Sequence, residues 1–293
     1  MRIAWLQDLC PACNEGGAQK TDWGHIKKGR ERGHSIEIIT PQNVSIRSLD
    51  CDLVIISNCM GFPRDVLTRI CSERPYVFFH HDFNFCKYRL YYSQLDKCKT
   101  CIDRQFWLKL YQSAKLHIWL SPLHREAYLF AFPELEKFRP VCVPSCIDVE
   151  KFKPVEGVER RRGTVIGVGA LEPFKSRYGA YNYGLANPQL SFTFVGQSAE
   201  INLPNCKYLS YVRNEDLPRL YSEHEFYINL PDTVQPFERT AAEAYLSGCK
   251  LILNENVGFF SYPWDYKNIE QVRHILKQAA TGWWEEVEGV MKK

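Results

Sequence analysis

The sequence lacks the features that assign many proteins to a broad class at first sight. No apolar stretch approaches the roughly 20 residues that an α-helix needs to span a bilayer. Basic and acidic residues nearly balance, 37 against 34, and the net charge of +3 is too small to indicate a nucleic-acid or membrane partner by itself. The chain has no internal repeat, no low-complexity tail and no clear basic amphipathic helix. These absences argue against a transmembrane, repeat or disordered protein.

What is present indicates an ordinary globular protein. The 293 residues are enough for two medium domains, and 45% hydrophobic and 24% charged residues are typical values. The aromatic content of 14% suits carbohydrate or base stacking, but buried aromatic side chains explain it more simply. Residues Met1–Asp8 show no signal-peptide pattern, so we expect a cytoplasmic protein in which most of the 12 cysteines are reduced.

Short apolar runs alternate with helical patterns along the whole chain. This alternation predicts parallel sheets built from strand–helix–strand units. Strands are expected at 3–6, 35–40, 53–57, 76–79, 116–120, 164–168, 190–195, 225–230 and 251–253. Helices are expected at 18–32, 63–72, 105–113, 121–130, 241–246 and 268–280, with a separate one at 283–293.

A polar stretch at 154–163 divides the chain, so we predict an N-terminal domain at 1–154 and a C-terminal domain at 155–293. The stretch contains Arg160, Arg161 and Arg162, which we interpret as a solvated linker; a basic patch for an anionic acceptor is the alternative.

The most informative stretch runs from the strand at 225–230 to the strand at 251–253. A polar loop follows the first strand, Thr240 can cap the helix that comes next, and Gly248 ends that helix. Open α/β sheets bind ligands where a strand ends, and helix N-termini hold phosphate. The loop at 231–239 is therefore a candidate ligand site.

Residues 235–244 (QPFERTAAEA) resemble the E-P-F-G-x-x-x-x-E-A signature of retaining GT-B glycosyltransferases of group 1, glycosyltransferase family 4. The resemblance implies a fold of two Rossmann-like domains with parallel sheets facing across a cleft. It also implies that Glu243 binds the ribose of a nucleotide sugar and that the loop holds the donor sugar. Gln235 stands where the family has its first Glu. The other donor contacts that it implies are Phe237, Glu238, Arg239 and Thr240, with Glu238 in the place of the Gly.

Other motifs follow in the family's order. Gly16-Gly17 resembles the loop that lies near the donor phosphates or the acceptor. His81 with its following Asp resembles the family's H-D motif, whose His approaches the donor sugar; the preceding His80 is the less favoured candidate. Residues 143–154 (VPSCIDVEKFKP) resemble the V-P-N-G-V-D-x-x-x-F-x-P hinge between the domains.

In the C-terminal half, residues 169–175 (GALEPFK) resemble a pattern in which Arg and Lys neutralise the donor diphosphate. Lys175 occupies the Lys position, whereas Ala170 stands where the Arg would be, and Arg177 is a candidate to compensate. Val212 is the candidate for contact with the base. The family commonly sends its last helix back to the N-terminal domain, which would give the tryptophans at 283–284 an apolar surface to cover.

The spacing of the cysteines is compatible with a structural zinc site. Cys98-x-x-Cys101 suits two thiolates on one metal ion, and Cys86 is a candidate third ligand, as in some bacterial relatives. A fourth ligand could come from other cysteines or a His, and the pair Cys10 and Cys13 could join Cys98 and Cys101 instead. Free or buried thiols are the alternative.

We therefore expect a retaining glycosyltransferase whose donor is a nucleotide-diphosphate sugar and which needs no cofactor, with structural zinc as an open question. The acceptor is open between a saccharide, a lipid-linked sugar and a modified nucleic acid. Gln235 and Ala170 favour a non-catalytic nucleotide- or sugar-binding protein or partner subunit as the alternative. A second alternative is a transferase acting on DNA or another polyanion. It is based on the three arginines at 160–162 and on the basic run Lys27, Lys28, Arg30 and Arg32.

Overall fold

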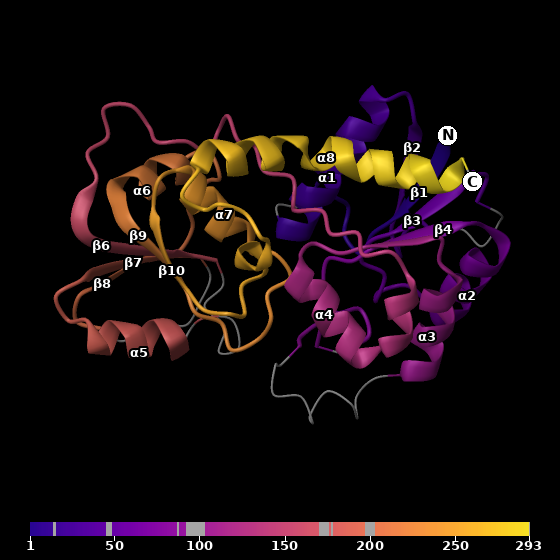
Figure 1. Ribbon diagram of the computed structural model, residues 1–293, viewed down its shortest axis with the longest axis horizontal. Helices are drawn as coiled ribbons and strands as arrows, with labels where there is room; N and C mark the ends of the chain where they lie inside the picture. Colours follow the sequence, from indigo (N-terminus) through magenta and orange to yellow (C-terminus); the bar gives the residue numbers. More distant parts are fainter. Residues whose placement is uncertain are drawn as a thin grey trace. The chain divides into compact units, whose positions relative to one another are not determined.

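A computed structural model describes residues 1–13, 16–44, 49–86, 88–91, 103–169, 176, 178–196 and 203–292. The chain forms two compact units. The first domain comprises Met1–Cys146 together with Gln278–Lys293, and the second domain comprises Ile147–Lys277. Each domain contains one five-stranded parallel sheet with helices on its faces (Figure 1).

The sheet of the first domain has the strand order β2-β1-β3-β4-β5. Its strands are β1 (Arg2–Leu6), β2 (Ser35–Ile39), β3 (Leu53–Ile56), β4 (Tyr76–Phe79) and β5 (Leu116–Ile118). Every residue of β3 and β4 is buried. Central strands of a parallel sheet are covered on both faces, so these two strands read as unbroken apolar runs.

Helices cover both faces of this sheet. They are α1 (Gly17–Glu31), α2 (Arg64–Glu73), α3 (Arg104–Ser113), α4 (Pro122–Ala131), the 3₁₀ turn η2 (Pro133–Lys137), and the C-terminal part of α8 (Ile269–Met291). Helix α1 lies with the end of α8 on one face, and α2, α3 and α4 lie toward the other (Figure 1).

The end of α8 belongs to the core of the first domain. Trp283 and Trp284 are fully buried, and Trp283 stacks on Trp5 with ring centroids 5.3 Å apart. Trp284 donates from Nε1 to the His25 carbonyl at 2.8 Å. Our prediction of two separate C-terminal helices is wrong, because α8 continues through Gly282. One interior glycine costs about 1 kcal/mol, which the burial of two indole rings outweighs.

The sheet of the second domain has the order β10-β9-β6-β7-β8. Its strands are β6 (Arg161–Val168), β7 (Ser191–Val195), β8 (Cys206–Leu209), β9 (His224–Asn229) and β10 (Lys250–Leu253). Its helices are α5 (Tyr178–Ala186), α6 (Leu217–Glu223), α7 (Arg239–Leu246), the turn η4 (Gly258–Ser261) and the start of α8. Helix α5 covers the opposite face from α6 and α7 (Figure 1).

We expected the arginines at 160–162 to form a solvated linker, and this prediction is wrong. Arg161 and Arg162 begin β6. The Arg160 guanidinium donates to the carbonyls of Tyr221, His224 and Ser247, so it ties α6 and the end of α7 to the sheet. A cation whose donors are used in this way is a structural element rather than part of a free basic patch.

Among the residues that the structure describes, no helix combines the length and the apolar character needed to cross a membrane.

Glu288 on α8 fastens this helix to α1 within the first domain, and it provides a test. Its carboxylate accepts hydrogen bonds from Arg32, with Arg32 Nη2 2.7 Å from Oε2, and lies 2.9 Å from Nε2 of His34. The hydrogen bond from Arg32 lowers the pKa of Glu288 from 4.5 to about 2. A depressed pKa means that the contact stabilises the folded state above pH 4.5 and is lost as the pH falls toward 2.

We therefore expect Glu288→Gln to lower the unfolding free energy by about 1–2 kcal/mol at pH 7. The difference from wild type should shrink as the pH is lowered from 5 to 3 in thermal unfolding experiments. Glu285→Gln, an exposed carboxylate on the same helix, is the control and should change little. A Glu288→Gln penalty that stays constant over this pH range would contradict the assignment.

Candidate functional site

The strand order of the second domain defines where a ligand can bind. From β6 the chain runs outward through β7 and β8, then returns to the other side of β6 to form β9 and β10. The reversal between β6 and β9 leaves a crevice at their carboxyl ends, which is where open α/β sheets bind ligands. The loops that follow these two strands carry the predicted donor motifs at 169–175 and 235–243.

A glycine follows each of the neighbouring strands β6 and β7, so no side chain projects at either strand end. Gly169 follows β6 with φ +123°, and Gly196 follows β7 with φ +128°. A Cβ atom on Gly196 would lie 2.5 Å from the carbonyl oxygen of Gly169. Any side chain at 196 would therefore collide with backbone, so the two strand ends can approach only through glycine.

The loop after β9 is held on both sides. The Leu230 amide donates to Ser176 Oγ at 2.7 Å, which attaches the loop to the segment after β6. Farther along, the Gln235 amide donates to the Asn256 carbonyl at 2.7 Å, and the Gly258 amide donates to the Gln235 carbonyl at 2.9 Å. These backbone bonds make the loop a fixed support rather than a loose connection.

Two of the predicted donor contacts have clear structural partners in this loop. The Gln235 side-chain amide donates to the carbonyl and the hydroxyl of the buried Thr233, at 3.2 and 3.0 Å. Phe237 is 2% exposed and packs edge-on against Phe259, with centroids 5.6 Å apart, and against Tyr262. The ring of Phe237 therefore anchors the loop to η4.

Glu238 takes an unusual backbone conformation at the start of α7. Its φ is +70° and its ψ is 80°, in the left-handed region that favours glycine. Its carboxylate accepts a hydrogen bond from the Thr240 hydroxyl, which is also 2.6 Å from the Tyr227 hydroxyl. Thr240 therefore lies inside the helix, and our expectation that it caps the helix is wrong, since α7 begins at Arg239.

Glu243 lies one turn into α7 and is only 3% exposed. Its carboxylate Oε1 is 3.4 Å from Nη2 of Arg239, which is itself mostly buried. A buried carboxylate needs a cation or several donors, because burial removes its hydration. Glu243 is thus a held internal charge next to the crevice, not a carboxylate on the helix surface.

Of the remaining predicted donor-site residues in this domain, the structure describes only Val212. Val212 is half-buried in the loop that follows β8. Lys175, Arg177 and Ala170 lie outside the described residues. Ser176, between the two cations in the sequence, is buried and accepts the bond from Leu230, and sequence reasoning missed it.

The first domain has its own reversal of strand order, between β1 and β3. Gly16 and Gly17 are exposed at the start of α1, the helix that follows β1. His81 follows β4 and is 3% exposed. Its Nε2 is 2.7 Å from Oδ1 of Asp22, a fully buried residue of α1. The predicted site residue His81 thus lies in a buried polar cluster at the carboxyl ends of the strands.

Sequence reasoning missed the centre of this cluster. Asp22 Oδ2 accepts hydrogen bonds from Ser57 Oγ at 2.7 Å and from Gln7 Nε2. A signal was present, because Asp22 shares a helix face with the buried Ile26 and Gly29, four and seven residues on. A carboxylate on an apolar face requires an internal partner.

His80 has a different environment from His81. It is fully buried, stacks between Phe78 and Trp119, and its Nε2 is 2.9 Å from Nδ1 of His117. Burial lowers the pKa of His80 well below its usual value. His80 is therefore an uncharged part of the core.

A second polar group lies at the same edge. Arg89 forms an ion pair with Asp8 and a 3.6 Å pair with Asp82, the residue that follows His81. Asp8 also accepts from the Gly61 amide at 2.8 Å, and Asn58 donates to Asp82 at 3.3 Å. These contacts join the loops after β1, β3 and β4.

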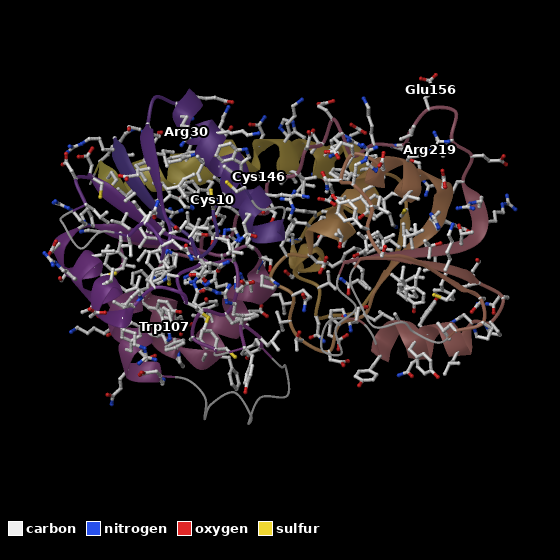
Figure 2. All side chains as sticks on the ribbon, turned by 180° about the vertical axis from the view of Figure 1, so that it is seen from behind. Cys10, Arg30, Trp107, Cys146, Glu156 and Arg219 are labelled. Carbon is white, nitrogen blue, oxygen red and sulfur yellow. The ribbon has the colours of Figure 1, made fainter. Side chains whose placement is uncertain are left out.

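The proposed metal ligands are only partly described. Cys86 is buried, whereas Cys98 and Cys101 lie outside the described residues. Within the part of the chain that the structure describes, no three His, Cys, Asp or Glu side chains come together as a metal site. Cys10 is half-buried in the first domain (Figure 2), and Cys13 is exposed.

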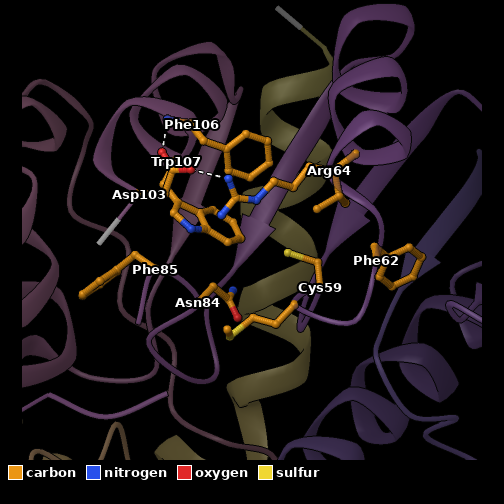
Figure 3. A pocket seen from close by; sticks show the side chains of 10 residues that line it. Cys59, Phe62, Arg64, Asn84, Phe85, Asp103, Phe106 and Trp107 are labelled. Carbon is orange, nitrogen blue, oxygen red and sulfur yellow. Dashed lines mark hydrogen bonds and ion pairs between the residues drawn. The ribbon is translucent and has the colours of Figure 1, made fainter. Parts of the chain in front are cut away.

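Figure 3 shows a cavity in the first domain between α2 and α3, of about 290 Å³. Arg64 and Asp103 form an ion pair at its edge, and the Arg64 guanidinium lies 4.8 Å from the ring centroid of Phe106. The lining residues are Cys59, Met60, Phe62, Arg64, Leu67, Asn84, Phe85, Asp103, Phe106 and Trp107.

Comparison with known proteins shows the fold. No family model and no curated protein sequence matches the chain. Sucrose-phosphate synthase from Thermosynechococcus elongatus is similar in structure, with a TM-score of 0.70 and 15% identity over 99% of this chain and 94% of that one. Anabaena HepE in complex with UDP and glucose has a TM-score of 0.64 and 16% identity over 96% and 94% of the two chains.

An alpha-glucosyltransferase in complex with UDP and a 13-mer DNA is also similar, with a TM-score of 0.64 and 13% identity over the whole of both chains. The chain has the GT-B architecture of two Rossmann-like domains. The expected fold class is thereby confirmed.

The left-handed Glu238 generates a prediction about stability. A non-glycine residue in this conformation costs about 1–2 kcal/mol, while its carboxylate holds Thr240. Glu238→Gly removes both the strain and the carboxylate, whereas Glu238→Ala removes only the carboxylate. We expect the Gly variant to be more stable than the Ala variant by about 1 kcal/mol in denaturant unfolding. An equal loss in both variants would show that φ at 238 relaxes at no cost.

Proposed function

We propose that this protein is a glycosyltransferase that moves a sugar from a nucleotide-diphosphate sugar to an acceptor hydroxyl with retention of configuration. The observation that carries the proposal is the buried Glu243 on α7, beside the crevice where β6 and β9 diverge. It occupies the position of the ribose-binding Glu in the signature that residues 235–244 resemble. The GT-B fold supports the same activity.

In this proposal Glu243 accepts hydrogen bonds from the ribose hydroxyls. Two hydroxyls can each donate to one oxygen of a carboxylate, and such charge-assisted bonds are strong in a buried site. Arg239 already neutralises this carboxylate in part and keeps its orientation. The sugar hydroxyls would not have to desolvate an unpaired charge.

The diphosphate needs positive charge, because it gains charge as the glycosidic bond breaks. We propose that Lys175 supplies it, with Arg177 in support and Ala170 leaving no second cation at the family's Arg position. The N-terminus of α7 adds a partial positive charge toward the crevice. No metal or other cofactor enters this proposal.

The sugar would contact the loop at 235–240. Gln235 can exchange its bonds to Thr233 for a sugar hydroxyl, since an amide both donates and accepts. Phe237 holds the loop in shape. Uridine is the first base to test, because the similar HepE and alpha-glucosyltransferase structures contain UDP. Val212 is the proposed base contact.

A non-catalytic nucleotide-binding protein is the second candidate, and Gln235 in place of Glu favours it. A transferase that acts on DNA is less favoured. One similar protein binds DNA, but the basic run of α1 is largely engaged here. Arg32 pairs with Glu288, and Lys28 pairs with Glu31. Arg30, labelled in Figure 2, donates to the Ile36 carbonyl at 3.0 Å.

The donor site can be tested by thermal stability with UDP, GDP, ADP and CMP and their sugar derivatives. A ligand that binds only the folded state at 100 times its dissociation constant adds about 2.7 kcal/mol of stability. We expect one nucleotide family to raise the melting temperature, and Glu243→Gln and Lys175→Ala to weaken its binding by about 10-fold or more.

The ligand-induced shift must be compared within each variant, because Glu243→Gln also removes the partner of Arg239. Glu156→Gln, at an exposed position in the second domain (Figure 2), is the matched control and should bind like wild type. No shift with any nucleotide from folded wild type would overturn the proposal. A shift without turnover in the presence of acceptors would favour the non-catalytic candidate.

A further inference from the structure

The buried side chain of Asp22 is the centre of a hydrogen-bonded cluster that includes His81. Four polar side chains meet there, from the end of β1 (Gln7), from α1 (Asp22), from the end of β3 (Ser57) and from the end of β4 (His81). All four are at most 3% exposed. Such a cluster is stable only if each donor faces an acceptor, so its hydrogen-bond directions can be worked out.

The contact of Gln7 Oε1 determines how the side-chain amide of Gln7 is oriented. Gln7 Oε1 accepts a hydrogen bond from the Asp8 amide at 3.1 Å, so the Nε2 group faces Asp22. Asp22 Oδ2 therefore accepts from Gln7, and it also accepts from the Ser57 hydroxyl at 2.7 Å. The second carboxylate oxygen, Oδ1, is left for His81.

The state of His81 follows in turn. Its Nε2 is 2.7 Å from Oδ1 of an acceptor carboxylate, so a ring proton lies on Nε2. In a neutral imidazole the other nitrogen, Nδ1, is then an acceptor. It is buried and has no hydrogen-bond partner among the described residues. The Phe79 ring packs edge-on against the imidazole with centroids 4.3 Å apart, which restricts its rotation.

The partner of His81 is not the Asp that follows it in the sequence. Asp82 is occupied by Arg89 and Asn58. His80 is equally unsuited, because its Nε2 faces His117 in the core. Asp22, 59 residues away, is the group that orients His81.

We propose that Asp22 is a positioning residue that holds His81 in the Nε2–H tautomer, so that Nδ1 accepts a hydrogen bond from a hydroxyl group of the substrate. The proposal deepens the proposed function, since the hydroxyl is that of a sugar. The place fits, because the cluster lies at the carboxyl ends of β1, β3 and β4, where the strand order of the first sheet reverses. A hydroxyl would also satisfy the buried Nδ1.

The substitution Asp22→Asn tests this directly, because only one orientation of the new amide fits. Gln7 and Ser57 both donate, so the Asn oxygen must face them and its NH₂ group must face His81. An NH₂ group at 2.7 Å forces Nε2 to become the acceptor and moves the ring proton to Nδ1. The variant is isosteric, and it reverses the hydrogen-bonding character of the atom that the proposal gives to the substrate.

The first measurement is the tautomer of His81 by ¹⁵N NMR of the imidazole nitrogens, with the signal assigned by its loss in His81→Gln. Wild type should show protonated Nε2, and Asp22→Asn should show protonated Nδ1. Ser57→Ala removes one donor to the other oxygen and should leave the wild-type tautomer, which makes it the matched control. Protonated Nδ1 in wild type, or no change in Asp22→Asn, would overturn the positioning role.

The second measurement is transfer from the donor found by thermal stability. We expect Asp22→Asn to lower kcat by about 10- to 100-fold with a smaller change in the donor KM. A switched tautomer with unchanged kcat would refute the contact with substrate. The tautomer measurement needs no donor and no transfer activity. Failure of the proposed function, seen as no nucleotide binding by wild type, is therefore distinguishable from failure of this inference.

Discussion

The reversal of strand order in each parallel sheet is the constraint on which the rest of the structure depends. Parallel strands need helical crossovers, and a sheet extended first to one side and then to the other leaves one pair of neighbouring strands whose connections diverge. In the second domain this pair is β6 and β9, and in the first it is β1 and β3. The clusters around Glu243 and Asp22 lie at such ends.

The two clusters solve the same physical problem with different means. A buried carboxylate loses its hydration, so it must be compensated within the protein. Glu243 is compensated by a cation on its own helix, Arg239, one turn away. Asp22 is compensated by neutral donors and an imidazole from three different strand ends. Glu243 therefore depends on the local geometry of α7, whereas Asp22 depends on the correct assembly of the whole first sheet.

The loop after β9 is held in place at the cost of backbone strain at Glu238. Glu238 adopts a left-handed conformation that glycine would adopt without strain, and its carboxylate is used to hold Thr240. Backbone bonds to residues 256–258 and the buried ring of Phe237 hold the loop from the other side. A loop that is fixed before a ligand arrives loses less entropy on binding, which suits the proposed donor site.

Local pattern in the sequence predicted the strands except β8 and the helices except α5 and α6. A short unbroken apolar run such as Tyr76–Phe79 is typical of a strand that is covered on both faces. The resemblance to the glycosyltransferase motifs, and not the pattern alone, indicated His81 and Glu243 as site residues. Only the tertiary structure decided which groups face each other: Asp22 and His81 are 59 residues apart, and no periodicity encodes that contact. The same holds for Arg160, whose carbonyl partners come from two distant helices, and for α8, which continues through Gly282 because Trp283 and Trp284 are buried in the first domain. Each depends on burial and on partners distant in sequence, which a local pattern does not contain.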